Sequence, residues 1–429
     1  MEVVKVNYRR LSTPYSATLH FMNELIGKHI VLGLTGGIAC YKAAELCRAL
    51  VKEGATVQVV MTSSSEQFIT PLTMQALSQR PVFTSQWDSR ELNNMAHINL
   101  SREADLILIA PCSADFMAKL LHGRADELLS LMCLARPALL VPLMLAPAMN
   151  REMWANPATQ RNAEQLRLDG IYLLDVGSGD QACGETGDGR MLESSEILDK
   201  VIGFFQPKSL LGQRVLITAG PTYEAIDPVR GLTNLSSGKM GFSIARAALE
   251  AGAYVTLISG PVSLIASRGI ERIDVKSARD MLDAVLFHQE KADIFIGAAA
   301  VADWRPDESQ LQKIKKNQTN SAPHFKLVEN PDILLTLAKS PRGRSRALFC
   351  VGFAAETEDL LVNVRDKRVR KEVPLLVGNI GPTTFGKDDN SLLLVDEYGE
   401  RELPRNNKLF LARQLIADIS YRVKGKVKL

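Results

Sequence analysis

Two segments of this 429-residue chain open in the same way, and this pattern constrains the fold more than any other feature. Residues 27–37 and residues 212–221 each form a short apolar run that ends in threonine and glycine. Such a run is typical of a parallel strand that enters a phosphate-binding loop. Apolar residues with helical spacing follow at 38–53 and, after a longer loop, at 236–252. The sequence therefore predicts two α/β domains built on βαβ units.

Further strands alternate with helical patterns in both halves, which is typical of doubly wound α/β folds. These strands are expected at residues 56–61, 106–110, 139–145, 254–259, 294–297, 348–351 and 375–377. A hairpin is predicted around Tyr398 and Gly399, with strands at 391–395 and 401–404, and an amphipathic helix is expected at 408–422.

A chain of this length exceeds what one core normally supports, so at least two domains are expected. Glycine and proline bracket residues 203–212, which we interpret as the linker between domains at 27–202 and 213–429. Residues 1–26 form an extension of open status. Met22 lies just before the first strand, which favours an overlong start, and the arginines are too few for a typical transit peptide.

The composition excludes several classes of partner. With 46% hydrophobic and 23% charged residues the chain is an ordinary globular protein. Lys and Arg exceed Asp and Glu by 51 − 48 = 3, which indicates neither a nucleic acid nor a membrane surface as partner. Basic residues cluster only at 313–316 and 365–371, a pattern that fits a small polyanion. The six cysteines show no zinc-ligand spacing, which favours a reducing, cytoplasmic compartment.

On fold alone, a nicotinamide-dependent reductase or dehydrogenase is the alternative interpretation. Neither opening strand is followed by a G-x-G-x-x-G motif, and no acidic residue ends the second strand. That strand is instead followed by Thr62 and Ser63, whose hydroxyl groups suit a phosphate monoester such as that of FMN. A flavin absorption band in the purified protein would distinguish the two interpretations.

One thiol, Cys183, lies in a glycine-dense segment at 177–189, which we expect to form a loop before a polar helix start. A core cysteine normally has apolar neighbours, and glycines at this density let the backbone approach a ligand closely. Two other blocks stand out beside it. They are Met95-Ala-His-Ile-Asn-Leu100 and Pro147-Ala-Met-Asn-Arg-Glu-Met-Trp154.

Together these three blocks resemble the flavin-dependent decarboxylases of the phosphopantothenoylcysteine family, which carry HI-x-L, PAMN and ACG motifs. The resemblance implies a flavodoxin-like flavoprotein domain that binds FMN. The positions that match the flavin-binding edges of the family are Gly36, Gly37, Thr62, Ser63 and the 110–115 turn with Ser113. Within that turn the family more often has alanine where Cys112 stands.

The same resemblance implies the catalytic roles. A flavin oxidises the substrate thiol to a thioaldehyde, which then accepts the electrons released with CO2. His97 matches the family's catalytic histidine and would act as the base. Asn150 would bind the substrate carboxylate, although by itself it could simply cap a helix. Cys183 matches the cysteine that protonates the ene-thiol, and Met153, Ala182 and Gly184 would lie against the substrate.

A second chemical centre is predicted at residues 220–241. Backbone donors of a turn rich in glycine and serine at a helix N-terminus attract phosphate, and Arg230 could form a bidentate clamp. This segment resembles the signature of CTP-dependent phosphopantothenate–cysteine ligases, and the resemblance continues over most of residues 210–420. It implies a nucleotide-binding ligase domain that activates 4′-phosphopantothenate with CTP to an acyl-cytidylate, which cysteine then opens.

The ligase resemblance also assigns residues. Lys313 matches the lysine that stabilises charge on the α-phosphate, and Asn234 matches the residue that handles the acyl-cytidylate. The remaining substrate and nucleotide contacts that it implies are Ala298, Ala299, Asp303, Asn330, Pro331, Asp332, Ile333, Phe353, Lys367 and Lys371. Mg²⁺ is expected with the nucleotide, but no ligand set is readable.

The two resemblances together imply a bifunctional enzyme of coenzyme A biosynthesis that acts on small molecules. Family decarboxylases assemble as trimers and the ligases as dimers, which implies a homo-oligomer, in full a dodecamer. The alternative is a non-catalytic flavoprotein that regulates a phosphatase. His97, Asn150 and Cys183 are all present and the chain ends in lysines, not in an acidic tail, so both features favour the enzyme.

Overall fold

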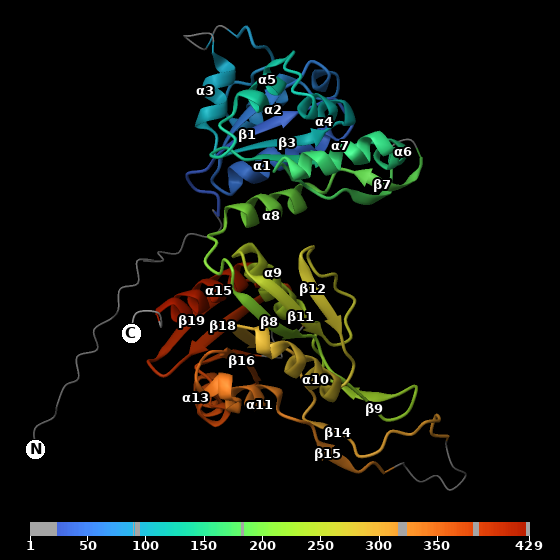
Figure 1. Cartoon of the computed structure of the whole chain (residues 1–429), viewed down its shortest axis with the longest axis vertical. Helices are drawn as coiled ribbons and strands as arrows, with labels where there is room; N and C mark the ends of the chain where they lie inside the picture. The colour runs from blue at the N-terminus through green and yellow to red at the C-terminus, as the bar shows by residue number, and fades with distance from the viewer. Residues whose placement is uncertain are drawn as a thin grey trace, which may run out of the picture. The chain divides into compact units, whose positions relative to one another are not determined.

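The computed structural model describes residues 24–88, 90, 95–181, 184–315, 324–380 and 386–425. The chain divides between Phe205 and Gln206 into two compact units, called unit 1 and unit 2 here. Both are α/β units with helices on the two faces of a largely parallel sheet (Figure 1). The predicted doubly wound α/β class is therefore confirmed.

The sheet of unit 1 has five parallel strands in the order β2-β1-β3-β4-β5. Their bounds are β1 (His29–Leu34), β2 (Thr56–Met61), β3 (Leu106–Cys112), β4 (Leu143–Pro147) and β5 (Tyr172–Leu173). The first four strands are almost continuously buried, because helices cover both faces of a parallel sheet.

Alternate residues of these strands belong to two separate cores, as the two-residue period of a strand requires. Leu32 and Leu108 pack in one core, while Val31 and Ile107 pack in the other. The helices of the first core are α1 (Cys40–Lys52), α2 (Pro71–Ser78) and α8 (Ser194–Phe205). Those of the second core are α3 (Ala96–Glu103), α4 (Ala114–Leu121), α5 (Leu128–Ala135) and α7 (Pro157–Leu168).

Two predictions for unit 1 are wrong. The strand expected at 139–145 begins only at Leu143, and Leu139 and Leu140 lie in an exposed turn. Helix α8 does follow from Ser194 as expected, but the segment around Cys183 is not a plain loop. It is an antiparallel hairpin of β6 (Gly177–Asp180) and β7 (Thr186–Arg190), which contacts the short helix α6 (Arg151–Ala155).

Unit 2 contains an eight-stranded sheet in the order β12-β11-β8-β13-β16-β17-β18-β19, with β18 and β19 antiparallel to their neighbours. The bounds are β8 (Arg214–Ala219), β11 (Tyr254–Ser259), β12 (Ile270–Asp274), β13 (Ile294–Gly297), β16 (Phe349–Glu356), β17 (Leu375–Ile380), β18 (Asp389–Val395) and β19 (Glu400–Asn407). The predicted terminal hairpin is β18–β19, and its turn contains Tyr398 and Gly399.

Two groups of helices cover the faces of this sheet. One core contains residues of α9 (Lys239–Glu250) and α15 (Lys408–Gly425), which pack against each other. The other core contains residues of α10 (Ala278–His288), α11 (Ile333–Lys339) and α13 (Leu360–Lys371). A short helix, α12 (Pro341–Arg344), follows α11.

Two small antiparallel ribbons stand apart from the large sheet of unit 2. The first pairs β9 (Tyr223–Ala225) with β10 (Gly231–Thr233), and the second pairs β14 (Trp304–Pro306) with β15 (Leu327–Glu329). The residues that join β9 to β10 include Asp227 and Arg230, and β10 leads directly to Asn234. The ribbons thus carry several of the residues predicted for the ligase site.

The junction between the units is shorter than the 203–212 segment that we predicted as linker. Residues 203–205 are the last turn of α8. On the other side, Leu210 is buried in the core of unit 2, and the Ser420 hydroxyl donates to the backbone oxygen of Ser209 at 2.9 Å. At the start of unit 1, Leu25 is also fully buried, although the predicted domain boundary was residue 27. In the described ranges, no helix is long and apolar enough to cross a membrane.

Candidate functional site

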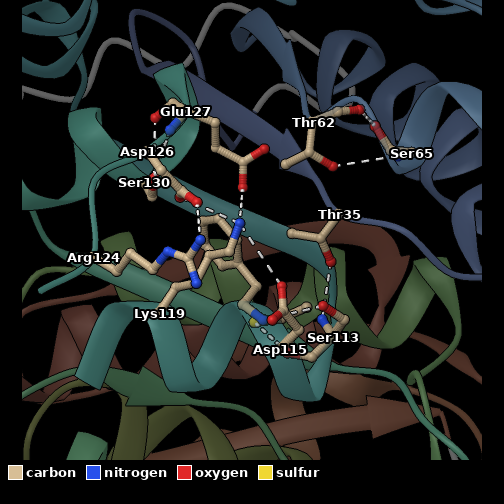
Figure 2. Close-up of polar contacts among 12 residues, drawn as sticks. Thr35, Thr62, Ser65, Ser113, Asp115, Lys119, Arg124, Asp126, Glu127 and Ser130 are labelled. Atoms are coloured by element: carbon tan, nitrogen blue, oxygen red, sulfur yellow. Dashed lines mark hydrogen bonds and ion pairs between the residues drawn. The ribbon is translucent and has the colours of Figure 1, made fainter. Parts of the chain in front are cut away.

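The residues predicted to bind the flavin all follow carboxyl ends of strands in unit 1. Gly36 and Gly37 follow β1, Thr62 and Ser63 follow β2, and Ser113 follows β3. Because the strands are parallel, these ends meet at one edge of the sheet, which is where open α/β sheets bind ligands. Figure 2 shows Thr35 and Ser113 beside each other, with Thr62 and Ser65 on the neighbouring turn.

Hydrogen bonds fix the turns at this edge. The Thr35 hydroxyl donates to the backbone oxygen of Pro111 at 2.8 Å and accepts from the Ser113 backbone N–H at 2.9 Å. The Ser113 hydroxyl caps α4 by accepting from the backbone N–H of Phe116 at 3.2 Å. These contacts hold the turns after β1 and β3 together.

The turn after β2 packs equally closely against the turn after β1. A Cβ at Gly36 would lie 2.6 Å from the Cβ of Ser64, so this position requires glycine, whereas a Cβ at Gly37 would meet open space. The Ser65 hydroxyl donates to the Thr62 backbone oxygen at 2.7 Å, while Ser63 is exposed. The edge therefore offers open backbone at Gly37 and an exposed hydroxyl at Ser63, which fit a phosphate group.

A charged cluster that the sequence analysis did not predict lies next to Ser113 (Figure 2). Lys119 pairs with Glu127 at 2.9 Å, with Asp126 at 3.3 Å and with Asp115 at 3.8 Å. Burial opposes the charge on Lys119, but the contacts with Glu127 and Asp126 outweigh it and raise its pKa. The cluster joins α4 to the start of α5. Four of its charged residues lie within 13 positions in the sequence, but their spacing matches no recognisable motif.

Asn150 both caps a helix and faces the Cys183 hairpin. Its side-chain oxygen accepts from the Glu152 backbone N–H at 2.8 Å, which begins α6. Its amide nitrogen donates to the Glu185 carboxylate at 2.5 Å and to the Gln181 side-chain oxygen at 3.3 Å. The capping alternative is thus correct for the oxygen of Asn150, and the amide nitrogen already binds a carboxylate.

The hairpin lies directly against the loop that contains Asn150. The Met149 backbone N–H donates to the backbone oxygen of Gly189 at 2.9 Å, and a Cβ at Gly189 would lie 2.6 Å from the Met149 backbone oxygen. At the hairpin tip, Gly184 donates to the Gln181 backbone oxygen at 2.9 Å. Ala182 and Cys183, which the sequence analysis assigned to the substrate site, lie outside the described residues. Met153 on α6 is half exposed.

His97 lies at the start of α3 and is half-buried. In Figure 1, α3 lies on one side of unit 1, and α6 and β7 lie on the other. The contacts agree, since α3 packs on α5 and β1 while α6 packs on α7 and β7. His97 at the start of α3 and Asn150 at the start of α6 therefore belong to helices that pack on different elements of unit 1.

Unit 2 contains a cavity of about 980 Å³ at the carboxyl ends of its strands. Every residue predicted for the ligase site except Arg230 and Lys313 lines this cavity. Those that do are Asn234, Ala298, Ala299, Asp303, Asn330, Pro331, Asp332, Ile333, Phe353, Lys367 and Lys371.

Hydrogen bonds to backbone carbonyl groups fix the side chains around this cavity. The Asn234 amide donates to the backbone oxygen of Ala300 at 3.0 Å, just beyond β13. The Asn330 amide donates to the backbone oxygen of Ala302 at 2.8 Å. The loops after β10, β13 and β15 thus meet at one wall.

Lys367 and Lys371 are one helical turn apart on α13, and both line the cavity. Lys367 pairs with Glu356 at 3.5 Å, and Lys371 pairs with Asp332, whose other oxygen caps α11. Both lysines are half-buried. The cluster at 365–371 is therefore not merely a solvated surface at these two positions.

The polar residues of the cavity that the sequence analysis did not assign to the site include Lys239, Asn379, Asn390 and Lys408. Lys239 lies inside the 220–241 segment, so its position could have been read from the sequence. It donates to Asp388 at 2.6 Å and to the Gly386 backbone oxygen at 3.2 Å. Burial and the charge of Lys239 lower the pKa of Lys408. No sequence signal marks Asn390 or Lys408.

Arg230 and Lys313 lie together, outside the wall of the cavity. The Arg230 guanidinium donates to the Ile314 backbone oxygen at 2.9 Å and lies 3.6 Å from Asp227. Lys313 and Lys315 are both exposed. In the described ranges, no group of three or more His, Cys, Asp or Glu side chains is arranged to hold a metal ion.

Comparison with known proteins assigns both halves. Residues 21–206 match the flavoprotein family, and residues 210–422 match the DNA/pantothenate metabolism flavoprotein C-terminal domain. The coenzyme A biosynthesis bifunctional protein CoaBC of Vibrio cholerae serotype O1 is 48% identical over 91% of this chain and 97% of its own length. The chain belongs to this family.

CoaBC of Escherichia coli K12 is 44% identical over 94% of this chain and 99% of its own length. A crystal structure of the C-terminal domain of a CoaBC protein is 36% identical, with a TM-score of 0.44, and covers 51% of this chain and 99% of that domain. As a member of the CoaBC family, this chain is a bifunctional enzyme of coenzyme A biosynthesis. Its flavoprotein half is the decarboxylase, and its C-terminal half is the ligase.

Proposed function

We propose that unit 2 joins 4′-phosphopantothenate to cysteine with CTP, through an acyl-cytidylate, and that unit 1 decarboxylates the resulting 4′-phosphopantothenoylcysteine with FMN. The observation that carries this proposal is the cavity of about 980 Å³ that brings together predicted residues from well-separated segments of unit 2, between Asn234 and Lys371. The product of the first reaction is the substrate of the second, which accounts for the two activities in one chain.

In unit 2, the substrate carboxylate must approach the α-phosphate of CTP while competing water is excluded. We assign Phe353, Lys367 and Lys371 to the nucleotide and Asn234 to the acyl-cytidylate. Their common position around the cavity supports this assignment. Lys313 would stabilise the charge that develops on the α-phosphate. Mg²⁺ would enter on the phosphates of CTP.

In unit 1, FMN supplies the oxidation of the substrate thiol when it is bound. The open backbone at Gly37 and the exposed hydroxyl of Ser63 fit its phosphate. Asn150 would bind the substrate carboxylate through its amide nitrogen, since this atom already binds the carboxylate of Glu185. His97 would take a proton from the substrate, and Cys183 would return one to the ene-thiol.

A homo-oligomer is part of this proposal. One decarboxylase site would combine His97 of one copy with Asn150 of another, a proposal supported by their positions on helices that pack on different elements of unit 1. Trimers of unit 1 and dimers of unit 2 would together give a dodecamer. We further propose a cytoplasmic location, which is supported by the buried thiols of the described cysteines, none of which is in a disulfide: Cys40, Cys47, Cys112, Cys133 and Cys350.

The decisive experiment supplies the purified protein with 4′-phosphopantothenate, CTP, Mg²⁺ and cysteine and detects the products by mass. We expect 4′-phosphopantetheine, CMP and CO2, and a flavin band in the absorption spectrum of the protein. Replacement of CTP by ATP should greatly reduce the yield. Formation of 4′-phosphopantothenoylcysteine without CO2, or failure to consume CTP, would refute the assignment of the corresponding half.

A further inference from the structure

Asp227 is a buried carboxylate in the turn between β9 and β10, and only 1% of its surface is exposed. One carboxylate oxygen, Oδ1, accepts from the backbone N–H groups of Val229 at 2.8 Å and Arg230 at 2.9 Å. These two contacts are those of an ordinary Asx turn and would by themselves explain an aspartate or an asparagine at this position.

The second carboxylate oxygen, Oδ2, serves a different segment. It accepts from the Ile314 backbone N–H at 3.2 Å and lies 3.6 Å from Nε of Arg230. Arg230 in turn donates to the backbone oxygen of the same Ile314 at 2.9 Å. The backbone N–H and the backbone oxygen of Ile314 are thus both bound by the Asp227–Arg230 pair. Asp227 precedes Ile314 by 87 positions in the sequence.

The bound segment is anchored at a second point. The Gln310 backbone N–H donates to the backbone oxygen of Ile226 at 2.9 Å, beside Asp227. Lys313 precedes Ile314, is exposed and lies outside the cavity wall. The strand that begins after Arg230, β10, leads to Asn234 in the cavity. The Asp227 turn therefore links the backbone that carries Lys313 to the hairpin that carries Asn234.

We propose that Asp227 is a positioning residue for the activation step, because it holds Ile314 and so sets where the Lys313 ammonium group can reach. This inference rests on the proposed role of Lys313. Burial opposes the charge on Asp227, but the N–H groups of Val229, Ile314 and Arg230 outweigh it and lower its pKa. At neutral pH the carboxylate consequently accepts on both oxygens, as the two sets of contacts require.

The substitution Asp227→Asn separates this role from the turn. Asparagine keeps one oxygen for Val229 and Arg230 but places an N–H₂ donor against the Ile314 N–H, which breaks the link to the Lys313 segment. We expect kcat for acyl-cytidylate formation to fall by about 10-fold with little change in the KM for CTP, since Lys313 is proposed to act in the transition state. Decarboxylation of added 4′-phosphopantothenoylcysteine by the same full-length protein should be unchanged.

A double-mutant cycle decides whether Asp227 acts through Lys313. In a Lys313→Gln background, Asp227→Asn should slow activation by less than about 2-fold, because the group that it positions is gone. Asp280→Asn is the matched control, since Asp280 also closes a local turn, with Ser277, but does not contact residues 310–315.

Three results would overturn the inference. The first is a normal kcat for Asp227→Asn, and the second is an equal loss from Asp227→Asn in the wild-type and Lys313→Gln backgrounds. The third is a loss of the same size from Asp280→Asn, which would indicate a general loss of stability. If Lys313→Gln alone were as active as the wild type, the proposed role of Lys313 would fail as well, and this single variant reveals that case separately.

Discussion

The side-chain amide nitrogen of Asn150 lies 2.5 Å from the carboxylate oxygen Oε2 of Glu185, at the tip of the β6–β7 hairpin. The Gln181 side-chain oxygen lies 3.3 Å from the same nitrogen. We have proposed that this amide binds the carboxylate of the substrate. In the structure described here, a carboxylate of the protein itself occupies that place, so the substrate must displace Glu185 before it can bind Asn150.

This competition predicts that Glu185→Ala lowers the KM for 4′-phosphopantothenoylcysteine. A partly exposed, charge-assisted hydrogen bond is worth about 1 kcal/mol net, which corresponds to roughly a 5-fold lower KM. Steady-state decarboxylation measures it. Glu152→Ala is the control, because Glu152 pairs with Arg151 and offers only its backbone N–H to Asn150. A KM that stays constant or rises in Glu185→Ala would show that Glu185 does not compete.

The two sheets could be predicted from the sequence because buried parallel strands are short apolar runs. Both opening strands could be placed from their apolar runs alone, which are Ile30 to Leu34 and Val215 to Ala219. An apolar run fails as a predictor at Leu139 and Leu140, which are exposed although their neighbours from Leu143 onward are buried. A continuous apolar run does not show which of its side chains face a core and which are exposed.

The β6–β7 hairpin could not be predicted, because its strands contain no apolar pattern. Its pairing is fixed by backbone hydrogen bonds and by the close approach of Gly189 to Met149, neither of which leaves a sequence signal. The ligase site likewise contains residues that could be predicted and residues that could not. Asn330 and Phe353, which the ligase resemblance assigns, line the cavity as expected. Lys408 also lines it, because the packing of α15 places the first residue of this helix there.

The proposed proton donor is tested by Cys183→Ser. Flavin reduction and CO2 release should continue, because His97 and the flavin act before the ene-thiol is protonated. Turnover should then stop with the ene-thiol product and reduced flavin, since serine is far too weak an acid to replace the thiol. Stopped-flow absorbance of the flavin, with mass detection of the product, measures both stages. Cys47→Ala, a change of a buried residue of α1, should turn over normally. Normal phosphopantetheine formation by Cys183→Ser would remove the proposed role.

The junction predicts where the two activities can be separated. Fragments 1–205 and 206–429 should fold and each retain its own activity. A fragment that starts at residue 213 should be less stable, because it lacks Leu210, which is buried in the core of unit 2. Loss of a buried leucine costs about 2–5 kcal/mol, so the thermal midpoint of 213–429 should lie clearly below that of 206–429. Equal midpoints would place residues 206–212 outside unit 2.

His29 predicts a pH dependence for unit 1. Burial and then the charge of Arg80 lower its pKa below 6.5, against the opposing charges of Glu103 and Asp105. Above pH 6.5 the folded and unfolded states are both neutral at this residue. As the pH falls below 6.5, the unfolded state takes up the proton first, so the stability of unit 1 should decline until the pH reaches the folded-state pKa.

Scanning calorimetry at pH 7.5 and pH 5.5 measures this decline. The transition temperature of unit 1 should drop less in His29→Gln than in the wild type, because the variant has no group to titrate. His122→Gln, on an exposed residue after α4, should behave as the wild type. An identical drop in wild type and His29→Gln would assign the pH dependence to other groups.

Lys313 tests whether the lysine cluster at 313–316 is catalytic or only solvated. Negative charge grows on the α-phosphate of CTP as the transition state forms, so a lysine aimed at it lowers the barrier without tightening ground-state binding. Loss of one such contact costs about 3–4 kcal/mol, and Lys313→Gln should slow acyl-cytidylate formation by roughly 10²–10³-fold with a small change in KM. Lys315→Gln is the matched control, because Lys315 is equally exposed and lies on the other side of Ile314. Single-turnover formation of the acyl-cytidylate measures both variants, and decarboxylation should be unchanged in each. Small, equal effects at the two positions would identify the cluster as a solvated surface. The charge on the α-phosphate would then fall to the lysines that line the cavity: Lys239, Lys367, Lys371 and Lys408.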